Sequence, residues 1–495
     1  MPPPTPIPPK KKQINLLRGW PSPSLLPAQL LSSATQRILS SPVSSVPLLQ
    51  YAPDEGYQPL RERLAQWLGR HYGVEPDANR ICVTGGASQN LACILQSFTD
   101  PGWTRAVWMV APCYHLAGAI FEDAGFRGRL RAVPEDEEGV DVGELERRME
   151  AWERDEEDKG VRPEQYETAV TETVLSRIFK KKANTPAPPV KPFKDPGPFR
   201  KLYRHVIYAV PTCSNPSGKT MSLDHRQALV RIARKHDALL ISDDVYDFLQ
   251  WPLSGTPTPE RPPEMRLPRL CDVDMAMGRA DNDPRGFGHA VSNGSFSKIA
   301  GPGVRTGWAE ATPAFVLGLS KTGSSMSGGA PSGLCAGMMA DLLESGELVD
   351  FIEEKTRPAL QRRHRIMMDA VREYLEPLGV VARESSVKGE GIYGGYFVWL
   401  TLTRGPLAVM VSDAALEEEN IIVGRGSMFA VKGDEDGARF DEDIRLCFSW
   451  EPEEDLVDGV KRLGELIGRM QGNLDHYEKL AARVKDSDRP VSSWV

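Results

Sequence analysis

The sequence has no apolar run near the ~20 residues that a bilayer-spanning helix needs, and its first residues lack the hydrophobic stretch of a signal peptide. We therefore expect neither a membrane protein nor an exported one. There is also no basic surplus, because 60 Lys and Arg stand against 68 Asp and Glu and the net charge is -8. This balance argues against nucleic acid or an anionic membrane as a partner.

Cysteines with a recognisable spacing are also lacking. The seven cysteines are odd in number, scattered along the chain and never spaced as C-x-x-C. This pattern argues against a disulfide framework and against a zinc site, so we expect no metal, and it fits a reducing cytoplasm. At roughly 150 residues per domain, the 495 residues predict two or three folding units.

Short apolar runs alternate with helical patterns in the first half of the chain. Residues 81–84 predict a buried strand, which leads into a turn of small residues at 85–88 and a helix over 89–98. Such runs, bounded by Pro, Asp or charged residues, are typical of a parallel sheet covered on both faces, so we predict an α/β fold. Further runs of this kind lie at 106–110, 206–210 and 238–241.

Other segments depart from this alternation. Residues 1–13 are rich in proline and predict a disordered tail, while 148–200 and 253–287 predict partly disordered surface insertions. After about residue 310, a helical stretch over 348–376 with a kink at Pro358 is followed by a strand over 394–400. A closing amphipathic helix presents one apolar stripe, which indicates a second domain. The stripe consists of Leu456, Val460, Leu463, Ile467 and Met470.

The densest chemical signal is the segment 295–308, Ser-Phe-Ser-Lys-Ile-Ala-Gly-Pro-Gly-Val-Arg-Thr-Gly-Trp. Lys298 stands among small and apolar residues, where desolvation disfavours an ammonium and lowers the pKa of the amine. A neutral lysine amine is a nucleophile that forms Schiff bases with carbonyl compounds. The two serines before it, together with Arg305, could hold a phosphate.

With the motifs that accompany it, this segment resembles the fold-type-I aminotransferases of class I/II that use pyridoxal 5′-phosphate (PLP), in the branch of the aminoadipate and kynurenine aminotransferases. The resemblance runs from about residue 15 to about 468, apart from the two insertions. It implies a mainly parallel sheet sandwiched by helices and a smaller α+β domain. It also implies that Lys298 carries PLP as a Schiff base and later moves a proton, and that Ser295 and Arg305 bind the phosphate.

The resemblance also implies domain limits. The expected divisions are an N-terminal segment of the small domain over 14–50, a large PLP-binding domain over 51–320, a small C-terminal domain over 321–485 and a tail over 486–495.

Residues 241–246, Ile-Ser-Asp-Asp-Val-Tyr, resemble the family's D-x-x-Y motif at a strand end. There the carboxylate pairs with the pyridine nitrogen of PLP and the tyrosine hydroxyl with the phenolate oxygen. A carboxylate keeps that nitrogen protonated, which strengthens the electron sink. The tyrosine must lie three residues after the carboxylate, so the register assigns Asp243 and Tyr246 and leaves Asp244 out.

In the family, three further motifs contact the cofactor, and this sequence has a match to each. Asn215, in Pro-Thr-Cys-Ser-Asn-Pro-Ser-Gly (211–218), would donate to the phenolate oxygen and also face the substrate. Residues 84–89 resemble the phosphate turn, with Gly86, Ala87 and Ser88 as contacts at a helix N-terminus. Tyr114 would stack on the cofactor ring. Without the resemblance, these motifs are ordinary turns or core residues.

The remaining matches concern the substrate and a second subunit. Arg445, in residues 443–449, would grip the substrate α-carboxylate, and Gly19 would line the substrate side. Tyr51, in residues 50–57, would reach the phosphate of a neighbouring subunit, which predicts a homodimer with shared active sites. Arg18 and the bulky Trp20 beside Gly19 depart from the family pattern, and the direction of Arg18 does not follow from the sequence.

The expected activity is therefore transfer of an amino group between an amino acid and a 2-oxo acid. A C–S lyase acting by β-elimination on the same scaffold is the alternative, and turnover without an oxo-acid acceptor distinguishes the two. A PLP-sensing regulator is a weaker alternative, because the segment before Ile14 is too short for a DNA-binding helix-turn-helix. The amino donor and the acceptor stay open.

Overall fold

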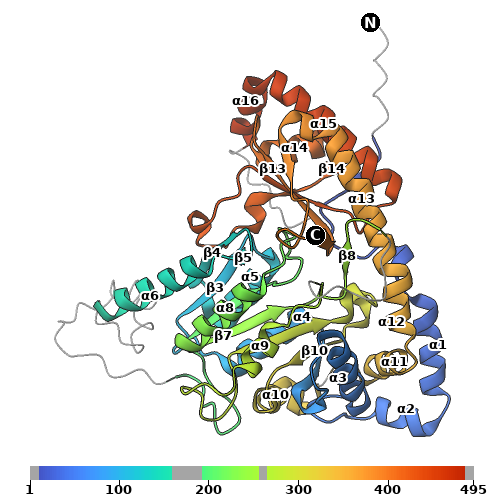
Figure 1. The fold of residues 1–495 in the computed structure, drawn as a ribbon, viewed down its shortest axis with the longest axis vertical. Coiled ribbons are helices and arrows are strands. Elements are labelled where there is room, and N and C mark those ends of the chain that lie inside the picture. The colour runs from blue at the N-terminus through green and yellow to red at the C-terminus, as the bar shows by residue number, and fades with distance from the viewer. Residues whose placement is uncertain (1–10, 159–191, 256–264, 330, 485–495) are drawn as a thin grey trace, which may run out of the picture.

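The computed structural model describes residues 11–158, 192–255, 265–329 and 331–484. Its centre is an eight-stranded sheet in the order β2-β10-β9-β7-β6-β3-β4-β5 (Figure 1). The strands from β9 to β4 run parallel, whereas β10 is antiparallel to both of its neighbours and β5 is antiparallel to β4. The strands are β2 (Ile81–Thr84), β3 (Ala106–Ala111), β4 (Leu130–Asp136), β5 (Gly139–Val140), β6 (His205–Ala209), β7 (Ala238–Asp243), β9 (Ala290–Ser295) and β10 (Gly307–Glu310). The predicted mainly parallel sheet is confirmed.

Helices cover both faces of this sheet, as its apolar strands require. In β3, Val107 and Met109 pack into one core cluster with helices α4, α5 and α10, while Ala106 and Trp108 pack into another with α6, α8 and α9. The alternation follows from the two-residue period of a strand. The helices are α4 (Ala87–Phe98), α5 (His115–Phe121), α6 (Val142–Asp158), α8 (Leu223–Lys235), α9 (Leu270–Ala276) and α10 (Pro313–Ser320).

A smaller antiparallel sheet in the order β11-β13-β16-β15 forms the upper part of the molecule in Figure 1. The closing helix α15 presents the predicted stripe, which is buried. At the predicted kink the helix contains a π-helical turn over Ile352–Thr356, and Pro358 follows two residues later. Proline lacks the N–H that a regular helical hydrogen bond needs. The elements are β11 (Val380–Ala382), β13 (Phe397–Leu402), β15 (Gly424–Arg425), β16 (Asp443–Cys447), α12 (Glu347–Phe351), α13 (Arg357–Tyr374), α14 (Ala408–Glu419), α15 (Glu453–Gly472) and α16 (Leu474–Val484).

The start of the chain runs alongside this smaller sheet before it returns to the large one. Strand β1 (Ile14–Asn15) pairs in parallel with β14 (Ile421–Ile422). A second two-stranded ladder, β8 (Gln250–Pro252) with β12 (Ile392–Gly394), ties the two parts together. The helices α1 (Ala28–Leu39), α2 (Pro42–Leu49), α3 (Gln58–Tyr72) and α11 (Gly333–Glu344) pack on one another at the lower right of Figure 1.

The structure describes parts of three segments that the sequence predicts as insertions or tail. In the described part of the predicted insertion 253–287, α9 contains buried residues, and Arg269 before it is 1% exposed and pairs with Asp272 and Glu310, so this helix packs into the core. The predicted insertion 148–200 begins inside α6, and 159–191 lie outside the described residues. Of the predicted disordered tail, Lys12 is ordered and pairs with Asp455 at 2.6 Å. Residues 1–10 and 486–495 also lie outside the described part.

Among the helices that the structure describes, none combines the length and the apolar composition that crossing a membrane requires.

Candidate active site

A cavity of about 250 Å³ opens at the carboxyl edge of the large sheet, where ligands of open α/β sheets bind. Its walls come from the ends of the parallel strands, from the small sheet and from the N-terminal segment Leu17–Pro21. The structure brings most of the predicted site residues together here. Those lining the cavity are Gly19, Ala87, Ser88, Tyr114, Asn215, Asp243, Tyr246, Ser295, Lys298, Arg305 and Arg445.

Lys298 follows β9 in a short 3₁₀ helix (Phe296–Lys298). Its Nζ donates to the carbonyl oxygen of Gly19 at 2.8 Å, and its own carbonyl accepts from the hydroxyl of Tyr396 at 2.9 Å. Burial lowers the pKa of Lys298 to about 8, because the desolvated ammonium is disfavoured. The side chain is therefore held in place, and its amine is neutral to a far greater extent than that of a lysine in water, about one tenth at pH 7.

Asp243 is the last residue of β7 and one of its carboxylate oxygens has a partner. Oδ2 accepts from the hydroxyl of Tyr208 at 2.7 Å, while the buried Oδ1 has no hydrogen-bond partner among the described residues. Burial raises the pKa of Asp243 to about 6. Asp244 does not line the cavity and instead accepts from the hydroxyls of Ser242 and Ser292. The sequence register, which chose Asp243 over Asp244, agrees with this placement.

Hydroxyls and a guanidinium gather at the N-terminus of α4, whose free N–H groups attract anions. Ser88 lies in its first turn, and Ser295 donates to Ser297 at 2.9 Å. Arg305 donates to the carbonyl oxygen of Gly85 at 2.8 Å and is directed across the turn. Gly86 has a φ of +95°, and a Cβ at this position would lie 2.7 Å from Nη2 of Arg305. Gly86 therefore lies beneath the anion site without lining it.

Arg445 on β16 meets Asn215 from the turn after β6. Its Nη1 donates to Oδ1 of Asn215 at 2.8 Å, which leaves the amide nitrogen of Asn215 as a donor. The guanidinium stacks over the ring of Phe397, 4.0 Å from its centre. Tyr246 packs edge-on against Phe397, and burial raises the pKa of Tyr246, so its hydroxyl stays protonated. Arg445 is thus buried with its planar face fixed, and no carboxylate among the described residues forms an ion pair with it.

The segment Leu17–Pro21 crosses the cavity and is held by the residues beneath it. Arg445 donates to the carbonyl of Leu17, Lys298 to that of Gly19, and the hydroxyl of Ser449 to that of Trp20 at 2.7 Å. A Cβ at Gly19 would lie 2.6 Å from the ring of Phe397, so the close approach requires glycine. Three carbonyls of this segment therefore accept hydrogen bonds from side chains in and beneath the site.

Sequence reasoning missed two groups that support or line the cavity. Tyr208 on β6 orients the carboxylate of Asp243, and no motif marks it. His115 follows Tyr114 and lines the cavity, with both ring nitrogens buried and without a partner among the described residues. Burial, and then the charge of Arg445, lower the pKa of His115 to about 4, so its imidazole is neutral. In the sequence, only the position of His115 directly after Tyr114 could have indicated that it lines the cavity.

Tyr51 is the predicted contact that this chain does not bring to its own cavity. It is 85% exposed and packs beside Gly328. Its position therefore leaves the expected role in a neighbouring subunit as a prediction.

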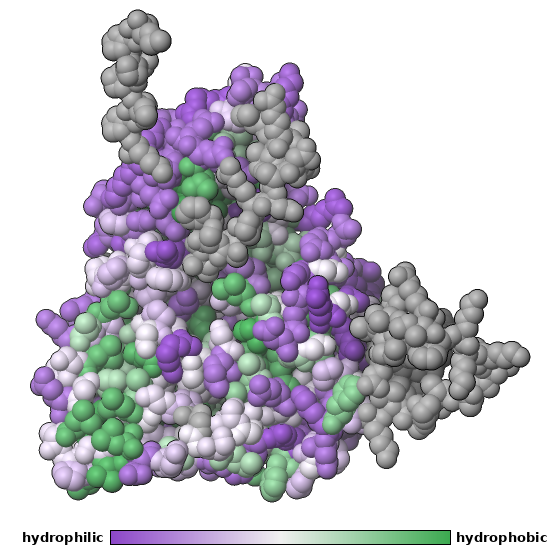
Figure 2. Space-filling view, turned by 180° about the vertical axis from the view of Figure 1, so that it is seen from behind, coloured by the Kyte–Doolittle hydropathy of each residue, from purple (hydrophilic) through white to green (hydrophobic). Residues whose placement is uncertain are grey.

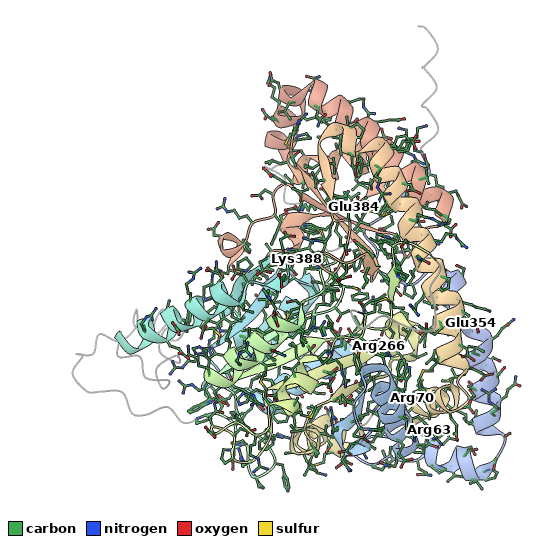
Figure 3. All side chains as sticks on the ribbon, viewed as in Figure 1. Arg63, Arg70, Arg266, Glu354, Glu384 and Lys388 are labelled. Carbon is green, nitrogen blue, oxygen red and sulfur yellow. The ribbon has the colours of Figure 1, made fainter. Side chains whose placement is uncertain are left out.

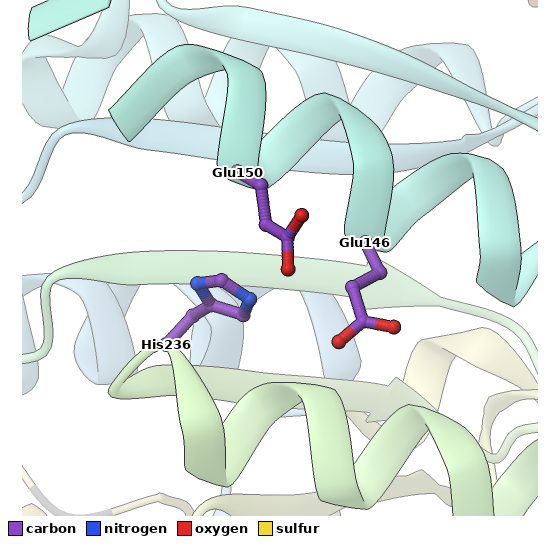
Figure 4. A group of neighbouring side chains, drawn as sticks. All are labelled: Glu146, Glu150 and His236. Carbon is purple, nitrogen blue, oxygen red and sulfur yellow. The ribbon is translucent and has the colours of Figure 1, made fainter. Parts of the chain in front are cut away.

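A second group of titratable side chains lies away from the cavity. Glu146 and Glu150 on α6 face His236 at the end of α8 (Figure 4). Lys235 donates to both carboxylates, at 2.6 and 2.7 Å. Its ammonium forms an ion pair with each carboxylate, so the group is an ion-pair cluster between two helices.

The cavity offers what the expected cofactor needs. PLP carries an aldehyde, a pyridine nitrogen and a phosphate, and the cavity offers an amine, an unpartnered buried carboxylate oxygen and an anion site. These belong to Lys298, to Asp243 and to the Ser88, Ser295 and Arg305 group. The donor set therefore fits PLP.

Comparison with known proteins agrees with this geometry. The sequence profile described as "Aminotransferase class I and II" matches residues 27–463. An uncharacterized protein of Saccharomyces cerevisiae is 32% identical over 473 residues, covering 92% of this chain and 97% of that protein. Aromatic-amino-acid aminotransferase 1 of Thermococcus litoralis is 25% identical over 454 residues, covering 92% and 88%. The structure of LysN, the alpha-aminoadipate aminotransferase of Thermus thermophilus, in complex with N-(5'-phosphopyridoxyl)-L-leucine, matches with a TM-score of 0.64 at 25% identity and covers 92% of both chains.

Proposed function

The chain belongs to the class I and II aminotransferases, and from this premise we propose which of its residues transfer the amino group. The enzyme is a transaminase that moves an amino group between an amino acid and a 2-oxo acid, and its cofactor is PLP. One observation carries the assignment of residues. The amine of Lys298 and the unpartnered Oδ1 of Asp243 line the same cavity as the α4 anion site.

When bound, PLP supplies an electron sink that acidifies the Cα–H bond of an amino acid. Lys298 would hold the cofactor through its amine, and the free amine would take the proton from Cα of the amino acid. Its lowered pKa suits both tasks, because each requires the neutral amine. The hydroxyl of Tyr396 fixes the backbone from which this amine reaches the substrate.

The remaining residues around the cavity bind the cofactor and fix its orientation. Asp243 holds the proton of the pyridine nitrogen through Oδ1, while Tyr208 keeps Oδ2 occupied. Tyr246 and the amide nitrogen of Asn215 donate to the phenolate oxygen, and Tyr114 covers the ring face. Ser88, Ser295 and Arg305 bind the phosphate, with the N–H groups of Gly86 and Ala87 beside them.

Arg445 binds the substrate α-carboxylate. A planar guanidinium holds a carboxylate by two parallel hydrogen bonds, which fixes the orientation of Cα. Stacking on Phe397 and the bond to Asn215 hold that plane before the substrate arrives. Gly19 leaves room for the substrate above Lys298, because its carbonyl and not a side chain faces the amine.

The test is turnover by the holoenzyme with a panel of L-amino acids and 2-oxoglutarate, with products identified by mass spectrometry. We expect glutamate and the oxo acid of each accepted donor in equal amounts. Repeated turnover of a donor in the absence of any oxo acid would instead identify a β-eliminating lyase and overturn the assignment.

We further propose that the enzyme is a homodimer whose subunits share active sites. Figure 2 shows hydrophobic side chains gathered at the end of the molecule where α1 and α2 lie. Val43, Val46 and Leu49 of α2 are exposed in the single chain, and Tyr51 follows directly. An apolar surface of this kind is typical of a subunit interface. Burial of α2 against a partner would bring Tyr51 towards the partner's phosphate site.

We also propose a cytoplasmic location. All seven cysteines are unpaired thiols, and six of them are buried. Thiols of this kind persist in a reducing compartment. Fluorescence microscopy of the tagged full chain tests this placement, and a signal confined to an organelle would contradict it.

A further inference from the structure

We propose that Asp247 and Arg226, which line a second and smaller cavity, act together as positioning residues. They fix the places of Tyr246 and Asn215, the two side chains that donate to the phenolate oxygen of the cofactor. This inference rests on the proposed function, because it assigns a support to two of the residues that bind PLP. Neither Asp247 nor Arg226 lines the active-site cavity, so both act through their neighbours.

The second cavity lies beside Arg266, which is labelled in Figure 3, because the residues directly before and after it line the wall. Its volume of about 10 Å³ is room for one water molecule. Two residues of the wall carry a buried oxygen without a hydrogen-bond partner among the described residues, Oδ1 of Asp247 and Oε1 of Gln250. A buried oxygen without a donor is costly, and a water bound here would supply one. Polar residues of the wall include Tyr72, Thr212, Thr220, Arg226, Asp247 and Gln250.

Arg226 closes the base of the turn that carries Asn215. Its Nε donates to the carbonyl of Met221 at 3.0 Å and its Nη2 to that of Pro211 at 3.2 Å. The N–H of Met221 also donates to the carbonyl of Pro211, so the guanidinium binds where the two ends of the turn meet. Nη2 donates to the hydroxyl of Thr212 as well, at 3.0 Å. These acceptors are all neutral, although the side chain of Arg226 is buried.

Asp247 directly follows Tyr246 in the turn after β7. Its Oδ2 accepts from the hydroxyl of Tyr72 on α3 at 2.5 Å. Its backbone carbonyl accepts from Nε2 of Gln250 at 3.1 Å, and the carbonyl of Tyr246 accepts from the N–H of Leu249 at 2.8 Å. Because Tyr246 and Asp247 are neighbours in one tight turn, displacement of the Asp247 backbone also displaces Tyr246.

Opposite charges join the two turns. Asp247 is 2% exposed and Arg226 1%. Burial raises the pKa of Asp247 and the charge of Arg226 opposes this shift, while burial lowers the pKa of Arg226 and the charge of Asp247 opposes it, ahead of that of Asp244. Thr212 accepts from Arg226 and its hydroxyl also lowers the pKa of Asp247. Loss of either charge would leave the other buried and uncompensated.

The test follows the visible absorbance of the holoenzyme as a function of pH, which needs no turnover. Donors to the phenolate oxygen draw off negative charge, so their loss lets the nitrogen that joins Lys298 to the cofactor keep its proton to higher pH. Tyr246→Phe and Asn215→Ala give the shift for direct loss of a donor. We expect Asp247→Asn to raise the midpoint by up to about 1 pH unit, the range of one hydrogen bond, and Tyr72→Phe to raise it less.

Asp274→Asn is the matched control. Asp274 is 2% exposed, pairs with Arg234 at 2.7 Å and lines neither cavity. Its replacement should lower the temperature of unfolding and leave the absorbance midpoint unchanged, because a purely structural loss does not reach the phenolate oxygen. A wild-type midpoint in both Asp247→Asn and Tyr72→Phe, beside shifted midpoints in the two donor variants, would overturn the proposal.

A measurement on the apoenzyme separates this proposal from the proposed function. Asp247→Asn, Arg226→Gln and the double variant are compared by chemical unfolding. We expect the double variant to lose less stability than the sum of the two single losses, because the second change removes a charge that the first left unpaired. A double variant that folds where Arg226→Gln does not would show the same coupling, and where neither folds the absorbance comparison decides. Additive losses sink the pairing of Asp247 with Arg226 even if the enzyme transaminates, whereas coupling without any transamination sinks only the proposed function.

Discussion

The Nζ of Lys298 donates a hydrogen bond to the carbonyl oxygen of Gly19, 2.8 Å away and 279 residues earlier in the chain. The amine that must react is therefore held by the N-terminal segment before any ligand arrives. The close contact depends on glycine, because the ring of Phe397 lies directly beneath. Arg445 stacks on the same ring, so the lysine, the segment and the carboxylate-binding arginine form one packed unit.

Replacement of Lys298 by alanine should abolish the covalent link to PLP and leave a folded protein. Alanine has no amine, whereas the phosphate contacts at Ser88, Ser295 and Arg305 stay intact. Borohydride reduction followed by mass spectrometry should add the cofactor mass to wild type and not to the variant. If Lys298→Ala still traps PLP covalently, another lysine is the carrier.

Asp243→Asn should slow Cα–H removal much more than it weakens PLP binding, because the amide cannot hold the pyridine proton while the phosphate grip is unchanged. Deuterium exchange at Cα and PLP titration measure the two effects separately. Asp244→Asn is the neighbouring control, since its carboxylate faces Ser242 and Ser292. If Asp244→Asn slows Cα–H removal and Asp243→Asn does not, the motif was assigned one residue too early and Asp244 is the functional carboxylate.

The rate of PLP capture by the apoenzyme should rise with pH and level off above about pH 8. Burial lowers the pKa of Lys298 to about 8, so the neutral, nucleophilic fraction grows up to that pH and is nearly complete one unit above it. A lysine in water would continue to gain up to its ordinary pKa of about 10.4. Stopped-flow absorbance across pH 6–10 gives the midpoint. A midpoint above 10 would show that the amine is not desolvated.

Gly19→Ala should weaken both stability and substrate binding, because its Cβ would lie 2.6 Å from the ring of Phe397. Crowding of this kind costs about 1–3 kcal/mol and displaces either the segment or the ring beneath Arg445. Thermal unfolding and KM for the amino donor measure the two consequences. Gly303→Ala is the matched control in the loop after Lys298, because nothing lies within 4 Å of its added Cβ. Equal behaviour of the two variants would remove the argument for close packing at Gly19.

Mixing two impaired homodimers should restore activity if Tyr51 serves the neighbouring subunit. In a heterodimer of Lys298→Ala and Tyr51→Phe chains, one site receives both wild-type Lys298 and wild-type Tyr51. The lost hydrogen bond to a charged phosphate is worth about 1.5–3 kcal/mol, so PLP affinity reports the rescue. Mixtures that show no more than the average of the parents would place Tyr51 within its own chain or outside the site.

Sequence reasoning predicted the features that local pattern determines. β2 falls at 81–84 as expected, because a short apolar run between polar turns has few alternatives inside a covered sheet. The choice of Asp243 over Asp244 also followed from a local spacing, and the structure places only Asp243 at the cavity. Both results depend on residues close together in the chain.

The features that the sequence did not predict concern side chains whose partners are distant in the chain. The segment containing α9 looked like an insertion because of its Pro, Arg and Asp content, yet Arg269 is buried by pairing with Glu310 on β10. Composition cannot show that two charges neutralise each other across 41 residues. His115 and the direction of Arg18 were hidden for the same reason, since the walls they face are built by later parts of the chain.

The pairing of β1 with β14 has a consequence for the order of synthesis. Ile14 and Asn15 leave the ribosome long before Ile421 and Ile422, so this pair of strands can form only after the segment between them has been synthesised. Contacts of such long sequence separation form late and slowly. A chain stopped before Arg445 thus already contains the lysine, Asp243 and the phosphate contacts, and still lacks the last residues that hold its N-terminal segment over the site.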